Sequence, residues 1–270
     1  MATIATAPGA PIRGPFAAAW QYRELFRQLV LRNLKVRYQR SGLGFLWLLV
    51  NPSMTVAILV VVFGHIVRLP IPSYWAFLIS GYFAWVFFLH TLGTSTYVIT
   101  EHASMAKSVA VPPDVFVMSA VMSRLIEFVV EMMLVMAVLA VFHHHRLPAS
   151  FVLVPVLIAL LLVMTLGLAL PAAALSVFFR DIQHGLPPAL QMLMYLSPVF
   201  YSSDLVPPVL APLYALNPLA LVLSLFHTVL YAGELPSALH LIQATVLSAV
   251  VYLIGYAVFR RQSRLFAEII

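Results

Sequence analysis

Three charged residues share one helical face within an otherwise apolar part of this 270-residue chain. Arg124, Glu127 and Glu131 are spaced i, i+3 and i+7, which aligns their side chains along one side of a helix. Charges at membrane depth are costly and normally face a bundle interior or water. Two interpretations stay open: an Arg124–Glu127 ion pair with Glu131 hydrogen-bonded between helices, or Glu131 as the proton relay of an ion-coupled carrier.

A run of histidines, His143 to His145, is the second group that could do chemistry, and Arg146 follows it. Consecutive residues do not share one helical face, no carboxylate lies close in sequence, and the chain has no cysteine. A metal site needs several ligands brought to one point. We therefore expect a solvated loop here and no bound metal.

Nucleotide binding is the chemistry that the sequence argues against most directly. A Walker A loop needs Gly-Lys-Ser/Thr after a glycine-rich turn, whereas the lysines are Lys35 in Leu-Lys-Val and Lys107 in Ala-Lys-Ser. There is also no His-Glu-x-x-His, Gly-x-Ser-x-Gly or Asp-x-Asp pattern. We therefore expect no enzyme and no cofactor bound by this chain; ATP and magnesium, if used, would be bound by a partner chain.

Composition places these residues in a membrane protein. The chain is 63% hydrophobic and 9% charged, far from the roughly 25% charged residues of soluble domains. A helical span needs about 20 apolar residues, and five runs are long enough. These runs are residues 45–67, 74–99, 116–142, 151–179 and 239–259.

The stretch 185–231 is ambiguous, because its length permits one span or two. Basic residues gather before the first span and after the last, at Arg260 and Arg261 among others, as is typical of cytoplasmic flanks. One span in this stretch puts both basic ends in the cytoplasm, whereas two would not. The prediction is an all-α membrane protein with six transmembrane helices, and with re-entrant half-helices at about 204–233 on the outer side between spans 5 and 6.

The residues before the first span predict a surface helix. Apolar side chains from Tyr22 to Leu34 recur at i, i+3, i+4, i+7, i+8 and i+12, with charged residues on the other faces. We expect this amphipathic helix to sink its apolar stripe into the cytoplasmic leaflet. Residues 1–44 then form a cytoplasmic N-terminal segment without a cleavable signal peptide, and 45–270 form the transmembrane domain. The clustering of basic residues at these flanks argues against nucleic acid as a partner.

Three segments resemble the permease subunits of polysaccharide-exporting ABC transporters, the type-2 permeases that handle O-antigen, capsule and teichoic acid. They are Arg37-Tyr38-Gln39-Arg40-Ser41-Gly42-Leu43-Gly44-Phe45-Leu46-Trp47 with Asn51-Pro52; Phe179-Arg180-Asp181-Ile182 with Leu196-Ser197-Pro198-Val199 and Tyr201; and Leu216-Asn217-Pro218-Leu219. Together their order and spacing are quite specific, and O-antigen exporters look somewhat closer than capsule exporters.

The resemblance implies a bacterial inner-membrane permease that works as a pair of copies around a channel, with two ATPase subunits carrying ATP and magnesium. By the same resemblance, its substrate is a lipid-linked glycan, and membrane lipids are further partners. Alternatives are an ion-coupled secondary transporter, or an ABC exporter of capsule, teichoic acid or a small lipid or drug. These segments do not assign the glycan or its lipid carrier.

The resemblance also implies roles for particular residues. The coupling helix for the ATPase would include Glu101, His102, Ser104, Lys107 and Ser108. An anionic lipid headgroup would enter at Arg37 and Arg40. Aromatic rings along the channel would be Tyr82, Trp85, Tyr195 and Tyr201. The outer gate would include Pro207, Pro208, Asn217 and Pro218.

Overall fold

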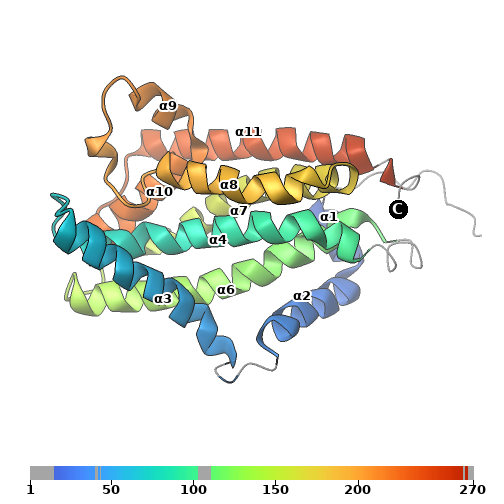
Figure 1. Cartoon of the computed structure of the whole chain (residues 1–270), viewed down its shortest axis with the longest axis horizontal. Coiled ribbons are helices and arrows are strands. Elements are labelled where there is room, and N and C mark those ends of the chain that lie inside the picture. Colours follow the sequence, from blue (N-terminus) through green and yellow to red (C-terminus); the bar gives the residue numbers. More distant parts are fainter. Residues whose placement is uncertain (1–14, 40–41, 43, 103–110, 264, 267–270) are drawn as a thin grey trace, which may run out of the picture.

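The computed structural model describes residues 15–39, 42, 44–102, 111–263 and 265–266, which form helices joined by short connections (Figure 1). In chain order the helices are α1 (Pro15–Gln21), α2 (Arg23–Tyr38), η1 (Gly44–Leu46), α3 (Trp47–Leu59), η2 (Val60–Ile66), α4 (Tyr74–Glu101), α6 (Pro113–Phe142), η3 (Ala149–Leu153), α7 (Val154–Phe178), α8 (Asp181–Tyr195), η4 (Ser203–Leu205), α9 (Ala211–Leu216), α10 (Pro218–Phe226), η5 (His227–Ala232) and α11 (Ala238–Ser263). No strand occurs in these described ranges. The all-helical class is therefore confirmed.

Five helical stretches of the described chain are long and apolar enough to cross a membrane. They are Trp47–Ile66, Tyr74–Glu101, Pro113–Phe142, Ala149–Phe178 and Ala238–Ser263, and they match five of the six predicted spans. Between α7 and α11 the chain instead forms α8, which has 15 residues, and the shorter apolar stretch Pro218–Ala232. A fifth crossing before α11 therefore stays a prediction.

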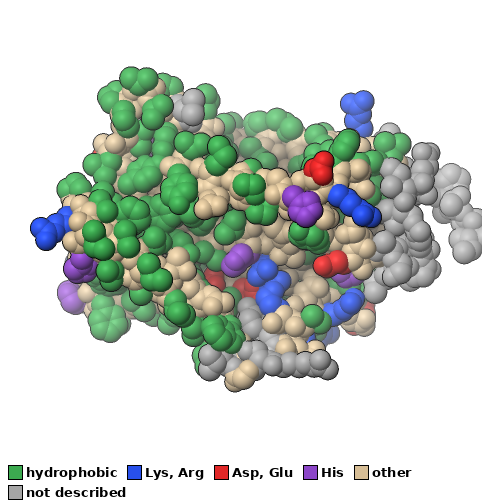
Figure 2. All heavy atoms as spheres, viewed as in Figure 1, with side chains coloured by type: hydrophobic (Ala, Val, Ile, Leu, Met, Phe, Trp, Pro, Cys, Tyr) green, Lys and Arg blue, Asp and Glu red, His purple; other side chains and the backbone are tan. Residues whose placement is uncertain are grey.

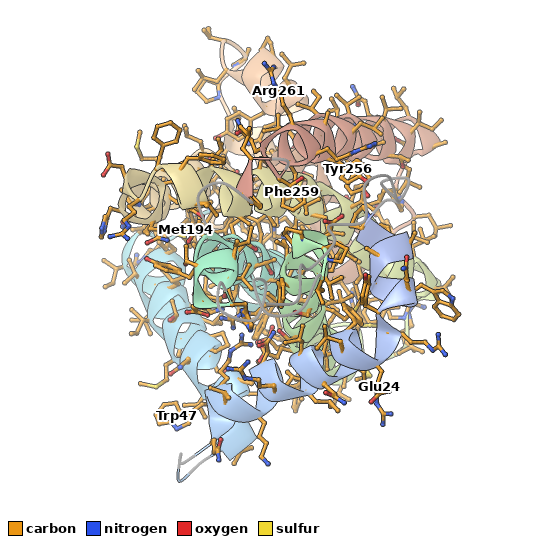
Figure 3. The ribbon with its side chains drawn as sticks, turned by 90° about the vertical axis from the view of Figure 1, so that its right-hand side faces the viewer. Glu24, Trp47, Met194, Tyr256, Phe259 and Arg261 are labelled. Carbon is orange, nitrogen blue, oxygen red and sulfur yellow. The ribbon has the colours of Figure 1, made fainter. Side chains whose placement is uncertain are left out.

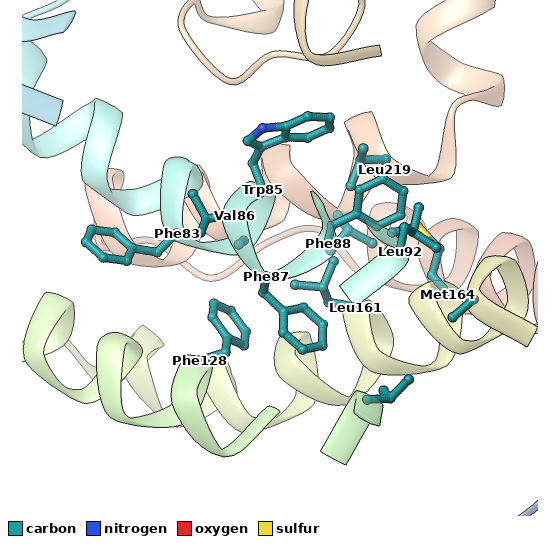
Figure 4. Packing of buried hydrophobic residues seen from close by; sticks show 14 of the residues in the cluster. Phe83, Trp85, Val86, Phe87, Phe88, Leu92, Phe128, Leu161, Met164 and Leu219 are labelled. Carbon is teal, nitrogen blue, oxygen red and sulfur yellow. The ribbon is translucent and has the colours of Figure 1, made fainter. Parts of the chain in front are cut away.

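Helix α4 lies at the centre of the bundle because it is apolar on all sides. It packs on α6 and on α7, and α7 packs in turn on α11. Aromatic residues fill the space around α4: the rings of Phe87 and Phe128 stack with centroids 4.9 Å apart, and those of Trp85 and Phe88 lie 5.7 Å apart (Figure 4). The core of this single copy is thus built around α4.

Two glycines let α7 and α11 touch backbone to backbone. A Cβ atom on Gly255 would lie 1.6 Å from the carbonyl oxygen of Gly167, and one on Gly167 would lie 2.6 Å from the Cα of Tyr252. Small residues that allow close approach are the usual means by which membrane helices pack. No larger side chain fits at either position without separating the helices.

The amphipathic helix is present as α2, and part of its apolar stripe packs on the bundle. Leu29 and Val30 are buried, Leu25 packs against the same core, and α2 rests on α6. Phe26 and Leu34 are half-buried, and the expectation that the stripe lies in the headgroup region stays a prediction. Figure 3 looks onto the end of the bundle where α4 finishes and shows Glu24 of α2 and Trp47 of α3 on the same side, opposite α11.

Candidate functional site

The predicted ion pair on α6 is present and extends to a third residue. Arg124 Nη1 lies 3.2 Å from Glu127 Oε2, and Arg124 Nη2 donates to Thr94 Oγ1 of α4 at 3.0 Å. Arg37 Nη1, 90 residues earlier in the chain, also pairs with Glu127 Oε1. One buried carboxylate thus joins α2 to α6, which spacing along α6 alone did not reveal.

A cavity of about 330 Å³ opens beside this ion-pair cluster, between α2, α3, α4 and α6. Figure 2 shows charged and histidine side chains gathered below the middle of α4, with further charged side chains toward the right-hand end of the same face. Glu131 lines the cavity, is 4% exposed, and makes no hydrogen bond or ion pair with the described residues. The interhelical hydrogen bond expected for Glu131 is therefore not formed there. The lining residues are Arg37, Trp47, Leu48, Asn51, Pro52, Val86, Phe87, His90, Arg124, Glu127, Phe128 and Glu131.

A second cavity, of about 420 Å³, lies at the end of α4, and Arg37 lines it as well. Glu101 is exposed there, whereas His102 is buried, stacks on Phe116 with ring centroids 5.2 Å apart, and brings its Nδ1 within 2.8 Å of the Val98 carbonyl oxygen. The structure thus brings two of the predicted coupling residues together with Arg37. The other predicted residues of these two groups lie outside the described part of the chain: Arg40, Ser104, Lys107 and Ser108.

The histidine run at the opposite end holds a helix end in place. His144 Nε2 donates to the carbonyl oxygen of Leu230 at 2.7 Å, and His143 Nε2 donates to that of Tyr231 at 3.1 Å. Ser150 donates to the preceding carbonyl, that of Val229, at 2.9 Å. The last carbonyls of a helix lack intrahelical partners, and these side chains supply them. The expectation of a purely solvated loop is therefore wrong.

His227 of η5 is a buried residue that the sequence analysis missed. Its Nε2 donates to the Pro198 carbonyl oxygen at 2.9 Å, its Nδ1 lies 2.7 Å from Ser80 Oγ, and its ring stacks on Phe77 at 4.0 Å. A Cβ atom on Gly81 would lie 2.5 Å from this ring. The sequence signal that could have identified His227 is a histidine inside an apolar run. A polar side chain that is buried with such a run needs hydrogen-bond partners.

The predicted outer-gate residues lie on the connection between α8 and α11. Asn217 caps α10, since its Oδ1 accepts from the backbone N–H groups of Leu219 at 3.0 Å and Ala220 at 3.3 Å, and Pro218 occupies the first turn. This is the usual Asn-Pro start of a helix. Pro207 and Pro208 are exposed. The pattern Asn217-Pro218 thus has a local folding role of its own.

The four predicted channel aromatics divide into two pairs. Tyr195 is exposed, and Tyr201 is half-buried with its hydroxyl paired to that of Tyr214. Tyr82 and Trp85 are buried within this single copy, Trp85 to 1% exposure. In this conformation a molecule outside the copy can reach the first pair of rings and not Trp85.

Comparison with known proteins gives the family. The profile of the ABC-2 type transporter family matches residues 24–231, which is more than half of the chain. The chain belongs to the ABC-2 type transporter family. It is 31% identical over 251 residues to the O-antigen export system permease protein RfbA of Myxococcus xanthus, covering 92% of this chain and 96% of that protein.

Two further proteins that are similar to this ABC-2 chain are also named as export or transport proteins. A Klebsiella pneumoniae protein, also named O-antigen export system permease protein RfbA, is 28% identical and covers 91% of this chain and 96% of its own length. The polysialic acid transport protein KpsM of Escherichia coli is 24% identical and covers 86% and 91% respectively. Members of this family are transport components and not ATPases, which agrees with the lack of a Walker A motif in the sequence.

Proposed function

We propose that this ABC-2 chain is the membrane-spanning permease subunit of an ATP-driven exporter that moves a lipid-linked polysaccharide, O-antigen or a similar cell-surface glycan, across the bacterial inner membrane. The observation that carries the proposal is similarity over 96% of the length of an O-antigen export permease. That match covers 92% of this chain.

The exporter contains two copies of this chain and two ATPase subunits, which bind ATP and magnesium. In each copy α8 and the segment after it make a fifth crossing, so that six spans put both termini in the cytoplasm and the α9–α10 pair on the outer side. The pairing of two copies is supported by the exposure of two apolar stretches, the one that contains α3 and the one that forms α11. Few residues of either stretch are buried within one copy. Those faces are available to lipid or to the second copy.

The ATPase docks at the cytoplasmic end of α4. The exposed carboxylate of Glu101 and the cavity that it lines with Arg32 and Arg37 support this location. The other proposed coupling residues, Ser104, Lys107 and Ser108, follow Glu101 in the sequence, outside the described residues. Motion of a docked ATPase would reach α2 and α6 through Arg37, because this residue lines the docking cavity and also pairs with Glu127.

The anionic headgroup of the lipid carrier enters at the cavity beside the ion-pair cluster. Arg37 and Arg124 line it, and guanidinium groups suit the oxygens of a phosphate. Arg40, three residues after Arg37 in the sequence and outside the described residues, is the second proposed entry residue. On the outer side Tyr195 and Tyr201 offer rings on which sugar faces pack, and the segment from Pro207 to Pro218 acts as the gate.

Two measurements test the proposal. The first is copurification of this chain with the ATPase encoded by an adjacent gene. The second identifies the glycan that is lost from the cell surface when the gene for this chain is deleted. Charge reversal by Glu101→Lys or Lys107→Glu should uncouple ATP hydrolysis from export while the protein still folds, because the charges act at the docking surface. Arg68→Glu, on the opposite end of the bundle, is the matched control and should leave coupling intact. Unchanged export in both docking variants would remove the docking assignment.

An ion-coupled carrier is the competing function, and the buried, unpartnered Glu131 is the observation that favours it. Transport driven by a proton gradient in liposomes that lack the ATPase, and abolished by Glu131→Gln, would support the carrier. Transport that requires the ATPase and survives Glu131→Gln would support the exporter.

A further inference from the structure

Two adjoining cavities lie at the outer end of the bundle, beneath the segment 202–216, which we call the outer strap. Their volumes are about 420 Å³ and about 300 Å³, and Ser203, Ser224 and Thr228 line both. Figure 1 shows α9, which belongs to the strap, standing at this end of the bundle with α10 beside it. Ligand pockets commonly have about 300–1,000 Å³, so the two cavities together have the size of a small-molecule site.

Hydroxyl groups dominate the polar lining, and several of them have free hydrogen-bonding capacity. The hydroxyls of Ser203 and Ser224 make no hydrogen bond with described residues, so each can both donate and accept. Thr228 Oγ1 donates to the Ser224 carbonyl at 3.0 Å, which leaves its lone pairs to accept. Asp204 Oδ2 accepts from Ser202 Oγ at 2.9 Å, which leaves Oδ1 of the same carboxylate.

The charges of the lining restrict the ligand further. Within the part of the chain that the structure describes, no Lys or Arg lines either cavity, and Asp204 is the charged side chain present. A phosphate or carboxylate ligand would find no cation here and would be repelled by Asp204. A hydroxyl ligand fits, because it can donate to Asp204 while accepting from Ser224 or Ser203.

The apolar part of the lining suits the same ligand. Pro70, Pro72 and Tyr231 line the larger cavity, and Leu221 and Tyr214 line the smaller one. The ring carbons of a pyranose present C–H groups that pack on such surfaces, while its hydroxyls turn to the polar groups. Hydroxyls that each donate and accept, mounted on an apolar ring, describe a neutral sugar.

We propose that the two cavities beneath the outer strap form a binding site for a neutral saccharide unit. The site rests on the proposed function in one respect: the sugar would be a unit of the exported glycan after it crosses the membrane. Recognition depends on the shared hydroxyls of Ser203, Ser224 and Thr228 and on the carboxylate of Asp204. It is distinct from the cytoplasmic cavity at Arg37, which has the opposite charge preference.

The test measures sugar binding to the full chain in lipid nanodiscs by saturation-transfer NMR. The probes are methyl α-D-glucopyranoside, methyl α-D-mannopyranoside and methyl β-D-galactopyranoside, with glucose 6-phosphate as the charged comparator. Saturation transfer to at least one neutral glycoside, stronger than to glucose 6-phosphate, is the expected result. Absence of transfer to all three glycosides, or stronger binding of the phosphate, would overturn the site.

Two variants locate the binding. Ser224→Leu fills the space that both cavities share, and Asp204→Ala removes the free carboxylate oxygen from an exposed position where folding is not at stake. Each should raise the Kd of the bound glycoside about fivefold or more, the effect of losing one hydrogen bond. Thr245→Ala removes a hydroxyl from α11, outside both cavities, and should leave the Kd unchanged. Wild-type affinity in both Asp204→Ala and Ser224→Leu would overturn the assignment.

The outcome can be separated from that of the proposed function. Export is measured in cells and association with the ATPase by copurification, whereas sugar binding is measured on the isolated chain. Intact export without sugar binding would reject the outer site alone. Sugar binding without ATPase association would reject the exporter while leaving the site in place.

Discussion

Single side chains at the η5 end of the bundle carry hydrogen bonds that helices cannot make for themselves. His143, His144 and Ser150 each donate to a carbonyl oxygen of η5, and His227 of η5 donates to the Pro198 carbonyl. A buried polar group without a partner costs about 1–3 kcal/mol. These residues therefore stabilise the α10–η5 segment against the rest of the bundle.

Gly81→Ala should disturb this arrangement through His227. The added methyl group would lie 2.5 Å from the imidazole, which must leave its place between Ser80 and the Pro198 carbonyl. Overpacking and a lost hydrogen bond together cost about 2–4 kcal/mol of unfolding free energy. Thermal melting of the purified protein measures the loss. The matched control is Gly93→Ala on the same helix, where a Cβ meets nothing within 4 Å and the change should be neutral or slightly stabilising.

His143 should make stability depend on pH. Burial lowers the pKa of the His143 imidazole below its ordinary value, although the Tyr231 carbonyl opposes the shift. The unfolded chain then binds the proton more readily, so this contribution to stability is present above a pH of about 6.5 and is lost as the pH falls below it. The melting temperature should drop between about pH 7.5 and about pH 5.5. His143→Gln keeps a donor for the carbonyl but does not titrate, so an equal drop in that variant would contradict the assignment.

At the scale of elements, the bundle depends on how closely helices approach and on where they begin. Gly167 and Gly255 allow α7 and α11 to meet at the backbone, and Asn217 starts α10 where the chain turns after α9. Helix α2 joins α6 by its apolar stripe and by the Arg37–Glu127 pair. The α7–α11 and α2–α6 contacts link residues far apart in the sequence, whereas the cap at Asn217 is local.

Gly255→Ala should separate α7 from α11. The new Cβ atom would lie 1.6 Å from the Gly167 carbonyl oxygen, and neither partner is a flexible side chain that could move away. The unfolding free energy should fall by about 3 kcal/mol, at the upper end for overpacked sites, which thermal melting in detergent can follow. Gly185→Ala in α8, where nothing lies within 4 Å, provides the comparison. A Gly255→Ala protein as stable as that control would mean that α7 and α11 do not pack in this way.

At the scale of the whole molecule, the topology rests on one segment. The described chain has five helices of spanning length, and α8, at 15 residues, is short for a crossing by itself. The number of crossings decides on which side each terminus lies. With a crossing between α7 and α11 the number is even and the two termini share one side of the membrane; without it the number is odd and they do not. The basic residues Arg260 and Arg261 at the end of α11 favour a cytoplasmic C-terminus. With six spans, the N-terminus is then cytoplasmic as well.

Cysteine labelling tests this topology directly, because the natural chain has no cysteine. Val209→Cys, at a position 88% exposed on the outer strap, should react with a membrane-impermeant maleimide in cells whose outer membrane alone is permeable. Gln262→Cys near the end of α11 should react after the inner membrane is opened and not before. Labelling of Gln262→Cys with the inner membrane intact would rule out six spans.

Much of the architecture follows from hydropathy alone. Five apolar runs became five helices of spanning length, because an uninterrupted apolar stretch of about 20 residues has few alternatives in lipid. The Arg124–Glu127 pair and the Asn217-Pro218 helix start were also predictable, since both depend on residues close in sequence. The family resemblance came from short local motifs and was confirmed over most of the chain.

The tertiary structure alone decided which side chains meet. Nothing in the spacing of α6 indicated Arg37 as the second partner of Glu127, and nothing in the histidine run indicated the carbonyls of Leu230 and Tyr231. The sequence predicted a lipid contact for the apolar stripe of α2 and gave no sign that Leu29 and Val30 would be buried in the bundle, where α2 packs on α6. Hydrophobicity is not directional, so it determines that a residue leaves water, whereas the partner of a charge or a hydrogen bond is fixed only when the helices have packed.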